Sequence, residues 1–375
     1  MRKIVFLTGT RADFGKIKSL ILALESHPEF EPYIFVTGMH LLEQYGYTVI
    51  EIERCEFSNI HTFLNHTDEA TMDLTLAKTI QGFSEYIKDV QPDLIVVHGD
   101  RVEALAGAIV GSLNNILVAH IEGGEVSGTV DELIRHSVSK MSHIHYVSND
   151  LAKQRLLQMG EIEASIKVIG SPDLDIMCSE GLPLIEEVKD YYDIPFDNYA
   201  IAMFHPVTTE YDNMATYAEN FVSALLADDT NYVVVFPNND LGSARILEAY
   251  NAFVGNPRFR VFPSIRFEYF LILLKHAQFI IGNSSAGIRE APYYDVPTIN
   301  IGTRQANRSA LSQIIQVDYS VDAIVEGLHK KPEYRLDHTP IEFGAGNSAQ
   351  LFLESVKDSV TWSINKQKQF VDFDR

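Results

Sequence analysis

The stretch Asp93-Leu-Ile-Val-Val-His-Gly-Asp-Arg101 decides the fold of this chain. Its apolar run, Leu94–Val97, has the length and composition of a strand that is buried on both faces of a parallel sheet. A segment of small residues, Val102–Leu113, follows the polar strand end and predicts a helix. In open parallel sheets, ligands bind beyond the carboxyl ends of the strands. Asp100 beside Arg101 at this position therefore predicts a ligand site.

Apolar runs and helical patterns alternate along the whole chain, which predicts βαβ units and mainly parallel sheets. The strands expected in the first half are Ile4–Thr8, Pro32–Val36, Leu94–His98, Leu117–His120, His145–Ser148 and Lys167–Ile169. Those expected in the second half are Tyr199–Phe204, Tyr232–Phe236, Arg260–Phe262, Phe279–Ile281 and Thr298–Ile301. We therefore expect the α/β class, with two Rossmann-like domains whose parallel sheets face a central cleft.

Two domains also suit the length, because 375 residues are many for a single hydrophobic core. An N-terminal domain, residues 1–175, ends where Gly170-Ser-Pro-Asp-Leu-Asp175 breaks the alternation. A C-terminal domain, residues 176–346, begins with an acidic connection and ends at a glycine-rich break. The remaining residues, 347–375, have helical character. We expect this C-terminal helix to pack back on the N-terminal domain.

The charge excludes several classes of partner. The net charge is −21, with 30 basic and 51 acidic residues. Nucleic acids and anionic membranes both require a basic face, so neither is expected, but local arginines can still bind a small anion. No apolar run reaches the roughly 20 residues that span a bilayer. Met1–Leu7 lead straight into a strand and do not resemble a signal peptide, so we expect a cytoplasmic protein.

No metal site is predicted. Cys55 and Cys178 are the only cysteines and neither lies in a CxxC pair, so two inert thiols in a reducing compartment are expected. Asp173-Leu-Asp175 matches a metal-binding DxD pattern, but the pattern is short and falls at the presumed hinge. His143 and His145 lie two residues apart, which is not a secure metal spacing without further ligands.

A glycine-containing turn, Gly9-Thr-Arg-Ala-Asp-Phe-Gly-Lys16, follows the first expected strand and opens a helix. Five residues separate its glycines and Ile17 stands where a P-loop has Ser or Thr, so this is not a P-loop. It does not match the GxGxxG dinucleotide motif either. The turn places Arg11 and Lys16 at a helix N-terminus, which suits a phosphate. From these residues alone, an ordinary loop with solvated charges is the alternative.

Further carboxylates follow another expected strand. In His120-Ile-Glu-Gly-Gly-Glu125, Glu122 lies at the strand end and two glycines would let the backbone approach a ligand. Asp131-Glu-Leu-Ile-Arg-His136 begins a helix, where acidic residues are often only complements to the helix dipole. Together with Asp100 and Glu122, however, Asp131 predicts acid–base chemistry, because like charges in a buried site shift one another's pKa values. Glu132 and His136 are candidates for a supporting role.

The second half of the chain has polar strand ends of its own. His205 follows one expected strand beside Pro206, and Asn238 lies in a similar segment, Phe236-Pro-Asn-Asn-Asp240. In Ile281-Gly-Asn-Ser-Ser-Ala-Gly-Ile-Arg-Glu290, we expect two serines to begin a helix whose amides and hydroxyls bind an anion. The candidates here are Ser284 and Ser285 for the anion, Glu290 for ribose hydroxyls, and Arg304 for the phosphates.

These motifs together resemble the hydrolysing UDP-N-acetylglucosamine 2-epimerases of bacterial sialic acid synthesis. The resemblance covers nearly the whole chain and rests on Thr10-Arg-Ala-Asp13, His98-Gly-Asp-Arg101, His120-Ile-Glu-Gly-Gly124, Asp131-Glu-Leu-Ile-Arg-His136, His205-Pro-Val-Thr-Thr209, Asn283-Ser-Ser-Ala-Gly-Ile-Arg-Glu290 and Gly302-Thr-Arg304. Each motif is weak alone, but seven in order are specific. That family has the two-domain GT-B fold, which agrees with the expectation above.

The resemblance also implies residue roles. Asp100, Glu122 and Asp131 match the family's catalytic carboxylates, with His205 acting near the diphosphate. Ile265 would meet the uracil through its backbone. The residues that would hold the rest of the UDP moiety are Arg11, Arg101, His205, Asn238, Ser284, Ser285, Glu290 and Arg304. Lys16 is the further candidate from the glycine-containing turn.

The resemblance implies UDP-N-acetylglucosamine as substrate, N-acetylmannosamine and UDP as products, and no required cofactor. Non-hydrolysing relatives carry Pro-Glu after the first arginine, where this chain has Ala12-Asp13, so the hydrolysing branch is favoured. The alternatives are a non-hydrolysing epimerase, a hydrolysing epimerase of a 2,4-diacetamido sugar nucleotide, a GT-B glycosyltransferase and a sugar-nucleotide sensor. We expect a homodimer or tetramer, which is the common state of soluble oligomers.

Overall fold

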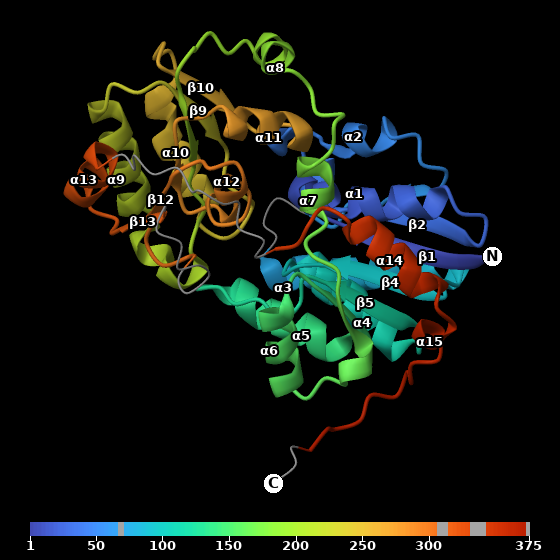
Figure 1. The fold of residues 1–375 in the computed structure, drawn as a ribbon. Coiled ribbons are helices and arrows are strands. Elements are labelled where there is room, and N and C mark those ends of the chain that lie inside the picture. Colours follow the sequence, from blue (N-terminus) through green and yellow to red (C-terminus); the bar gives the residue numbers. More distant parts are fainter. Residues whose placement is uncertain (67–70, 306–313, 331–342, 373–375) are drawn as a thin grey trace. The chain divides into compact units, whose positions relative to one another are not determined.

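The computed structural model describes residues 1–66, 71–305, 314–330 and 343–372, and the chain forms two compact units (Figure 1). Unit 1 comprises Met1–Glu125, Asp131–Ser179 and Ile341–Arg375, and unit 2 comprises Val126–Val130 and Glu180–Pro340. The boundaries expected from the sequence lie within a few residues of these. One segment differs: residues 126–130 group with unit 2, because the Gly128 amide donates to the Arg304 carbonyl at 3.2 Å.

Unit 1 contains a parallel sheet, whose strands within the described residues run in the order β3-β2-β1-β4-β5-β6-β7. They are β1 Arg2–Thr8, β2 Phe30–Val36, β3 Ile60–Thr62, β4 Leu94–His98, β5 Leu117–Ile121, β6 Ile144–Val147 and β7 Ile166–Val168. Ile4 of β1 lies opposite Leu94 of β4, and the strand order reverses between these two strands. Ligands bind open α/β sheets at such a switch point. The loops after β1 and β4 therefore form the expected binding end of unit 1.

Helices cover this sheet. They are α1 Arg11–Glu25, α2 Val49–Glu53, α3 Met72–Val90, α4 Val102–Leu113, α5 Val130–Met141, α6 Asp150–Gln158, α7 Asp173–Met177, α14 Ser348–Lys357 and α15 Ser359–Trp362, with short 3₁₀ turns η1 Gly38–Leu41, η2 Glu43–Tyr45 and η3 Glu163–Ser165. The small residues of α4 let it pack closely on β4. A Cβ atom at Gly107 would lie 2.6 Å from the Val97 side chain. The predicted helix after Asp100 thus forms because its sequence permits this close approach.

Unit 2 contains a second parallel sheet, which within the described residues runs in the order β10-β9-β8-β11-β12-β13. Its strands are β8 Ala200–Met203, β9 Tyr232–Val235, β10 Phe259–Phe262, β11 Ile280–Gly282, β12 Thr298–Ile301 and β13 Ile314–Val317. The order reverses between β8 and β11, where Ile201 lies opposite Ile280. The loops that follow β8 and β11 are those that carry His205 and Ser284. They therefore occupy the switch point of unit 2.

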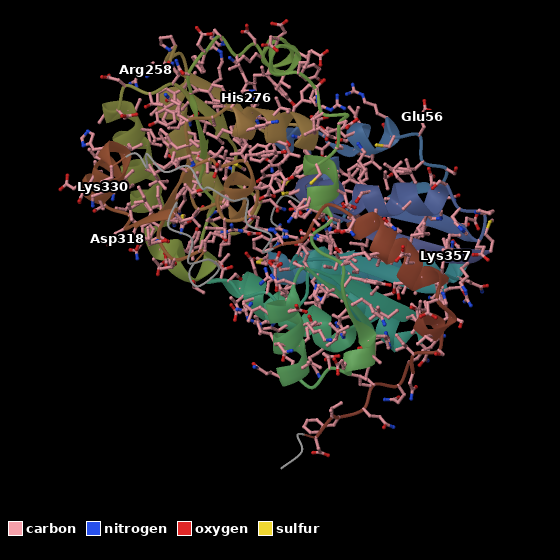
Figure 2. All side chains as sticks on the ribbon, in the orientation of Figure 1. Glu56, Arg258, His276, Asp318, Lys330 and Lys357 are labelled. Atoms are coloured by element: carbon pink, nitrogen blue, oxygen red, sulfur yellow. The ribbon has the colours of Figure 1, made fainter. Side chains whose placement is uncertain are left out.

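The helices of unit 2 are α8 Ile185–Tyr191, α9 Met214–Ala227, α10 Ser243–Tyr250, α11 Phe267–Lys275, α12 Glu290–Tyr293 and α13 Val321–His329, with 3₁₀ turns η4 Thr208–Asn213, η5 Asn251–Phe253 and η6 Ser285–Gly287. The end of α9 is closed by Arg258, which is labelled in Figure 2. Its guanidinium donates to the carbonyls of Leu226 at 2.9 Å and Thr230 at 3.4 Å. Such bonds satisfy carbonyl groups that a helix end leaves without partners.

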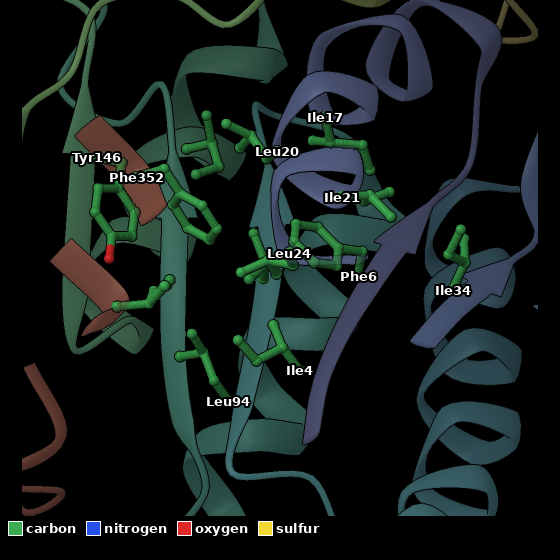
Figure 3. Packing of buried hydrophobic residues seen from close by; sticks show 14 of the residues in the cluster. Ile4, Phe6, Ile17, Leu20, Ile21, Leu24, Ile34, Leu94, Tyr146 and Phe352 are labelled. Atoms are coloured by element: carbon green, nitrogen blue, oxygen red, sulfur yellow. The ribbon is translucent and has the colours of Figure 1, made fainter. Parts of the chain in front are cut away.

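The C-terminal segment packs into the core of unit 1. Phe352 of α14 is fully buried, and its ring centroid lies 6.2 Å from that of Phe6 and 5.0 Å from that of Tyr146 (Figure 3). The helix expected within residues 347–375 does not extend through the whole segment. It ends at Lys357, because Asp358 accepts a hydrogen bond from the Val360 amide and caps the short helix α15. No helix or strand follows α15 up to residue 372.

Replacing Phe352 by Ala should lower the free energy of unfolding of unit 1 by about 3–5 kcal/mol, because it removes a buried aromatic side chain and leaves a cavity. Trp362 is the only tryptophan and lies in unit 1, so its fluorescence during urea denaturation reports this unit. Phe370→Ala, at a side chain that is 88% exposed, is the matched control and should change little. Equal stabilities of the two variants would contradict the packing of α14.

Candidate active site

Glu122 stands at the carboxyl end of β5 and is buried among polar partners. Its carboxylate lies 3.1 Å from His98 Nε2 and 3.4 Å from Lys16 Nζ, and it accepts the hydroxyl of Ser171. Its backbone has φ +64°, a left-handed conformation that costs a residue with a Cβ atom about 1–3 kcal/mol. Strain of this kind persists only where surrounding contacts hold the residue in place, as His98, Lys16 and Ser171 hold Glu122. Glu122 therefore remains a strong candidate for a functional carboxylate.

Lys16 does not lie at a helix N-terminus as expected. It is the sixth residue of α1 and is buried, with Nζ between Glu122 and Asp173, which lies 3.2 Å away. The N-terminus of α1 is occupied instead by Asp13, which accepts the amides of Gly9 at 3.0 Å and Thr10 at 3.1 Å. Lys16 is therefore a partner of carboxylates in this structure.

Arg11, the other cation of this turn, lies 3.0 Å from Glu51. Burial raises the pKa of the neighbouring Asp13, and hydrogen bonds from Thr8 and Gly9 lower it in part, leaving it above its ordinary value. The turn after β1 thus presents an arginine that already has a carboxylate partner. A phosphate ligand at Arg11 would have to compete with Glu51 or share the guanidinium with it.

Asp100 forms an ion pair with Arg135, a buried residue of α5 that the sequence did not single out. Arg135 also donates to the carbonyl of Glu125 at 3.3 Å. Burial lowers the pKa of Arg135, but the charges of Asp100, Glu125, Asp131 and Glu122 outweigh it and raise the pKa above its ordinary value. One buried guanidinium thus acts electrostatically on all three carboxylates predicted from the sequence.

The residues of α5 divide into a buried and a half-exposed set. Asp131 is buried on the same side as Arg135, one helical turn earlier. Glu132 and His136 lie 3.4 Å from each other, with each side chain about one-third exposed. Glu132 and His136 thus pair with each other, whereas Arg135 pairs with Asp100. The spacing of Asp131 and Arg135 was the sequence signal that could have identified Arg135.

The two glycines after Glu122 pack against protein on the side where a Cβ atom would lie. A Cβ atom at Gly123 would lie 2.8 Å from the Ser139 hydroxyl and 2.9 Å from His120 Nδ1. One at Gly124, where φ is +77°, would overlap the Ala152 carbonyl. The glycines therefore let the loop pack closely against α5 and α6.

His120 holds the loop that carries Asp100. Its Nε2 donates to the Gly99 carbonyl at 2.8 Å, and its Nδ1 lies 3.0 Å from the Ser139 hydroxyl. Burial lowers its pKa to about 3, so the ring is neutral at physiological pH. Burial, together with the charge of Arg11, lowers the pKa of His40 to about 3 as well. Both rings therefore serve as neutral hydrogen-bonding groups.

These two histidines predict a loss of stability in mild acid. In the unfolded chain a histidine binds a proton below its ordinary pKa of 6.5, whereas His120 and His40 stay neutral in the fold down to about pH 3. Their stabilising effect is complete above pH 6.5 and is lost as the pH falls, by about 1.4 kcal/mol per pH unit for each ring below about pH 6. His120→Gln and His40→Gln should each flatten the dependence of unfolding free energy on pH by this amount. A wild-type slope in both variants, followed by Trp362 fluorescence between pH 5 and 7, would contradict the assignment.

In unit 2, His205 is held at the switch point by Asn283. The His205 amide donates to Asn283 Oδ1 at 2.6 Å, and Asn283 Nδ2 donates to the His205 carbonyl at 2.8 Å. The amide of Asn238 donates to His205 Nδ1 at 3.0 Å, so in the neutral ring the proton lies on Nε2. Arg304 Nη1 donates to the Asn283 carbonyl at 3.1 Å. The structure thus brings three of the predicted residues, His205, Asn238 and Arg304, together around Asn283.

The serines do not begin a regular helix. Ser284 caps the 3₁₀ turn η6 by accepting the Ala286 amide, and α12 starts separately at Glu290. A continuous helix would place Pro292 in its interior, where the ring would clash with the carbonyl four residues earlier. Restarting at Glu290 puts Pro292 in a first turn, which proline tolerates. The expected dipole of a long helix is therefore absent from this loop, although Ser284 and Ser285 keep their predicted position after β11.

The remaining predicted residues lie in the loops and helix starts that follow their strands. Arg101 precedes α4 as its N-cap, Ile265 is buried just before α11, and Glu290 is buried at the start of α12.

Within the described ranges no group of three or more His, Cys, Asp or Glu side chains could hold a metal ion. None of the described helices is long and apolar enough to cross a membrane.

Sequence reasoning missed His98 and Ser171, which contact Glu122, and Asp173, which contacts Lys16. His98 was quoted only as part of a motif, Asp173 was set aside as a DxD decoy, and Ser171 was treated as part of the hinge. All three are buried or nearly so at the end of the unit 1 sheet. His98 ends one expected strand, and Ser171 and Asp173 follow another, so their positions were a signal that these residues lie at a sheet end. That they meet Glu122 and Lys16 did not follow from the sequence.

Comparisons with known proteins agree with this arrangement. The profile of the UDP-N-acetylglucosamine 2-epimerase family matches residues 22–357. A UDP-N-acetylglucosamine 2-epimerase of Neisseria meningitidis is 48% identical over 375 residues, with 99% of each chain covered. A hydrolysing UDP-N,N'-diacetylbacillosamine 2-epimerase of Legionella pneumophila is 34% identical, with 95% of this chain and 96% of that protein covered.

The fold agrees as well. The crystal structure of the Methanocaldococcus jannaschii UDP-GlcNAc 2-epimerase in complex with UDP-GlcNAc and UDP matches with a TM-score of 0.83 at 22% identity, and covers 95% of this chain and 99% of that one. This likeness confirms the predicted α/β fold of the GT-B type with two parallel sheets. From the profile match and the 48% identity, the chain belongs to the UDP-N-acetylglucosamine 2-epimerase family.

Proposed function

We propose that this protein is a hydrolysing UDP-N-acetylglucosamine 2-epimerase, which converts UDP-N-acetylglucosamine and water into N-acetylmannosamine and UDP. The observation that carries the proposal is the position of three carboxylates in unit 1: Asp100 in an ion pair with Arg135, Asp131 one helical turn before Arg135, and Glu122 at the end of β5 beside β4. Both removing the C2 proton and returning one on the opposite face require positioned acids and bases. A binding protein without turnover has no use for three such carboxylates.

In the first stage a base removes the C2 proton while UDP leaves from C1, which gives 2-acetamidoglucal. The C2 proton is weakly acidic, so the charge that develops on the leaving UDP must be stabilised. We assign this role to unit 2, where His205 presents an Nε2 proton and Arg304 is held beside Asn283. Ser284 and Ser285 follow β11 in the same unit and would add hydroxyl donors.

In the second stage water adds across the double bond with the opposite configuration at C2. We propose that Asp100 serves the elimination and that Glu122 and Asp131 serve the hydration. Lys16 and His98 flank Glu122. They can stabilise its carboxylate when it is charged and fix its position when it carries the proton. A positioned acid or base of this kind contributes about 10²- to 10⁴-fold to the rate. No hydride moves in either stage, so we propose that no redox cofactor is needed.

Chromatography of the products of purified protein and UDP-N-acetylglucosamine tests the proposal. We expect UDP and free N-acetylmannosamine in equal amounts. UDP-N-acetylmannosamine in equilibrium with the substrate would instead assign the non-hydrolysing reaction. Transfer of the sugar that requires an added acceptor would assign a glycosyltransferase. Size-exclusion chromatography with light scattering of the same sample tests the proposed homodimer or tetramer.

A second candidate substrate is a 2,4-diacetamido sugar nucleotide, because a relative that is 34% identical carries the name of such an enzyme. The chemistry at C1 and C2 would be the same for this substrate. The two candidates are separated by comparing kcat/KM on both sugar nucleotides. We expect the higher value with UDP-N-acetylglucosamine, and a higher value with the diacetamido sugar would replace the proposed substrate.

A further inference from the structure

The C-terminal tail, residues 363–372, is bound by unit 1 although it forms neither helix nor strand. Figure 1 shows it as the red ribbon beyond α15. His143 Nδ1 accepts the Val118 amide at 3.0 Å, so the ring proton lies on Nε2. This Nε2 lies 3.0 Å from the Lys366 carbonyl and donates to it. The backbone of the tail is therefore fixed by a specific hydrogen bond from a residue that precedes β6.

Lys368 then places its ammonium group on the end of α5. Its Nζ donates to the Ser142 carbonyl at 2.6 Å, the Ser139 carbonyl at 3.3 Å and Glu161 Oε2 at 2.5 Å. An ammonium group has three donors, so these acceptors use all of them. Ser139 lies in the last turn of α5 and Ser142 directly follows the helix. A cation at this end stabilises a helix, because the terminal carbonyls carry partial negative charge.

Glu161 is a further group of unit 1 that binds the Lys368 ammonium. Its side chain is buried and also lies 2.9 Å from His145 Nε2. Burial alone would raise the pKa of Glu161, but His145 and Lys368 outweigh it and lower the pKa to about 2. Glu161 is therefore a buried anion with two ammonium partners, Lys368 on Oε2 and Lys140 of α5 at 2.9 Å on Oε1, and losing one of them weakens the compensation of its charge. Lys368 is thus held to unit 1 by a charge that is itself shielded from water.

The opposite end of α5 carries the proposed catalytic machinery. Asp131 lies in the first turn and Arg135, the partner of Asp100, in the second. Ser139, whose carbonyl accepts from Lys368, uses its hydroxyl to contact His120, which in turn donates to the Gly99 carbonyl. The tail is therefore connected to the carboxylates in two ways, through helix α5 and through this series of hydrogen bonds.

We propose that Lys368 is a positioning residue, which docks the C-terminal tail on α5 and thereby fixes Asp131, Arg135 and Asp100 for the reaction. This inference rests on the proposed function for its kinetic part. Small displacements of catalytic groups cost about 10²-fold in rate when they reach 1 Å. The residues expected to hold the nucleotide, those of unit 2 together with Arg11 and Arg101, lie outside α5. The loss of the tail contact should therefore lower kcat and leave KM for UDP-N-acetylglucosamine unchanged.

The experiment compares three full-length variants: Lys368→Met, Lys368→Arg and Lys330→Met. Lys330, labelled in Figure 2, pairs with Glu326 at 2.7 Å on the surface of unit 2 and is the matched control. For each protein, kcat and KM are measured, and hydrogen exchange of a peptide spanning residues 130–142 is followed by mass spectrometry. We expect Lys368→Met to lower kcat about 10- to 100-fold, keep KM within about twofold and speed exchange of α5 at least about tenfold. Lys368→Arg should keep kcat and the exchange rate of α5 close to their wild-type values. The control variant, Lys330→Met, should match the wild type.

Two results would overturn the inference. The first is wild-type exchange of α5 in Lys368→Met, which would mean that the tail does not hold the helix. The second is an unchanged kcat, or a raised KM with unchanged kcat, which would mean that the contact has no bearing on the catalytic groups. If the wild-type protein has no activity on UDP-N-acetylglucosamine, the proposed function fails, and the exchange measurement still decides whether Lys368 positions α5.

Discussion

Asp100→Asn should slow UDP release from UDP-N-acetylglucosamine, with kcat lowered about 10²- to 10⁴-fold. The amide keeps the size of the side chain but cannot accept a proton from C2. Arg135 keeps its contact with the Glu125 carbonyl and the charges of Asp131 and Glu122, so the site should stay folded. Formation of UDP by a coupled assay is the measurement, and Trp362 fluorescence verifies that unit 1 is intact.

Asp93→Asn is the matched control for this prediction. Asp93 lies just before β4, at the opposite end of the strand from Asp100, and accepts the Lys3 amide at 2.9 Å. Its variant should release UDP within about twofold of the wild-type rate. Wild-type UDP release by Asp100→Asn would remove this carboxylate from the elimination stage and with it the assignment of the base.

Glu122→Gln should separate the two stages of the reaction. We expect UDP release to continue while 2-acetamidoglucal accumulates, because hydration then lacks its proton donor and falls about 10²- to 10⁴-fold. Glutamine can still contact Lys16 and His98 through its carbonyl oxygen, so the loop after β5 should persist. The glycal is followed by mass spectrometry of the reaction mixture, and hydration is followed separately with glycal and UDP added to the variant.

The control here is Glu163→Gln, at a carboxylate that is 71% exposed and paired with Lys153 on the surface. It should produce N-acetylmannosamine at the wild-type rate without detectable glycal. The assignment fails if Glu122→Gln blocks UDP release but hydrates added glycal normally. In that case Glu122 would be the base of the elimination, and Asp100 would serve the second stage.

The parts of the fold that the sequence predicted are those where a single local pattern decides the structure. β4 and α4 have the expected bounds, because an apolar run followed by small residues is compatible with little else. The edge strands β3 and β13 were missed. Both are short and partly exposed, so they lack the apolar run by which the buried strands were recognised.

The candidate site, like the fold, was predicted from the sequence only in part. Strand ends placed Asp100, His205 and Ser284 at the two switch points and Glu122 beside the first of them, after β5, because the parallel order of the strands gathers their carboxyl ends. The partners of Glu122 could not be predicted in this way. Lys16 lies 106 residues and Ser171 lies 49 residues from it in the sequence, and only the packing of α1 and the loop after β7 brings them together.

Proton NMR of UDP-N-acetylglucosamine incubated with the protein in D2O tests the central claim most directly, because it reports the bond at C2 and the fate of the sugar together. The account predicts free N-acetylmannosamine that carries deuterium at C2, together with UDP. N-acetylmannosamine that retains the original proton at C2 would contradict elimination and hydration at this carbon, and intact UDP-N-acetylglucosamine would contradict the proposed substrate.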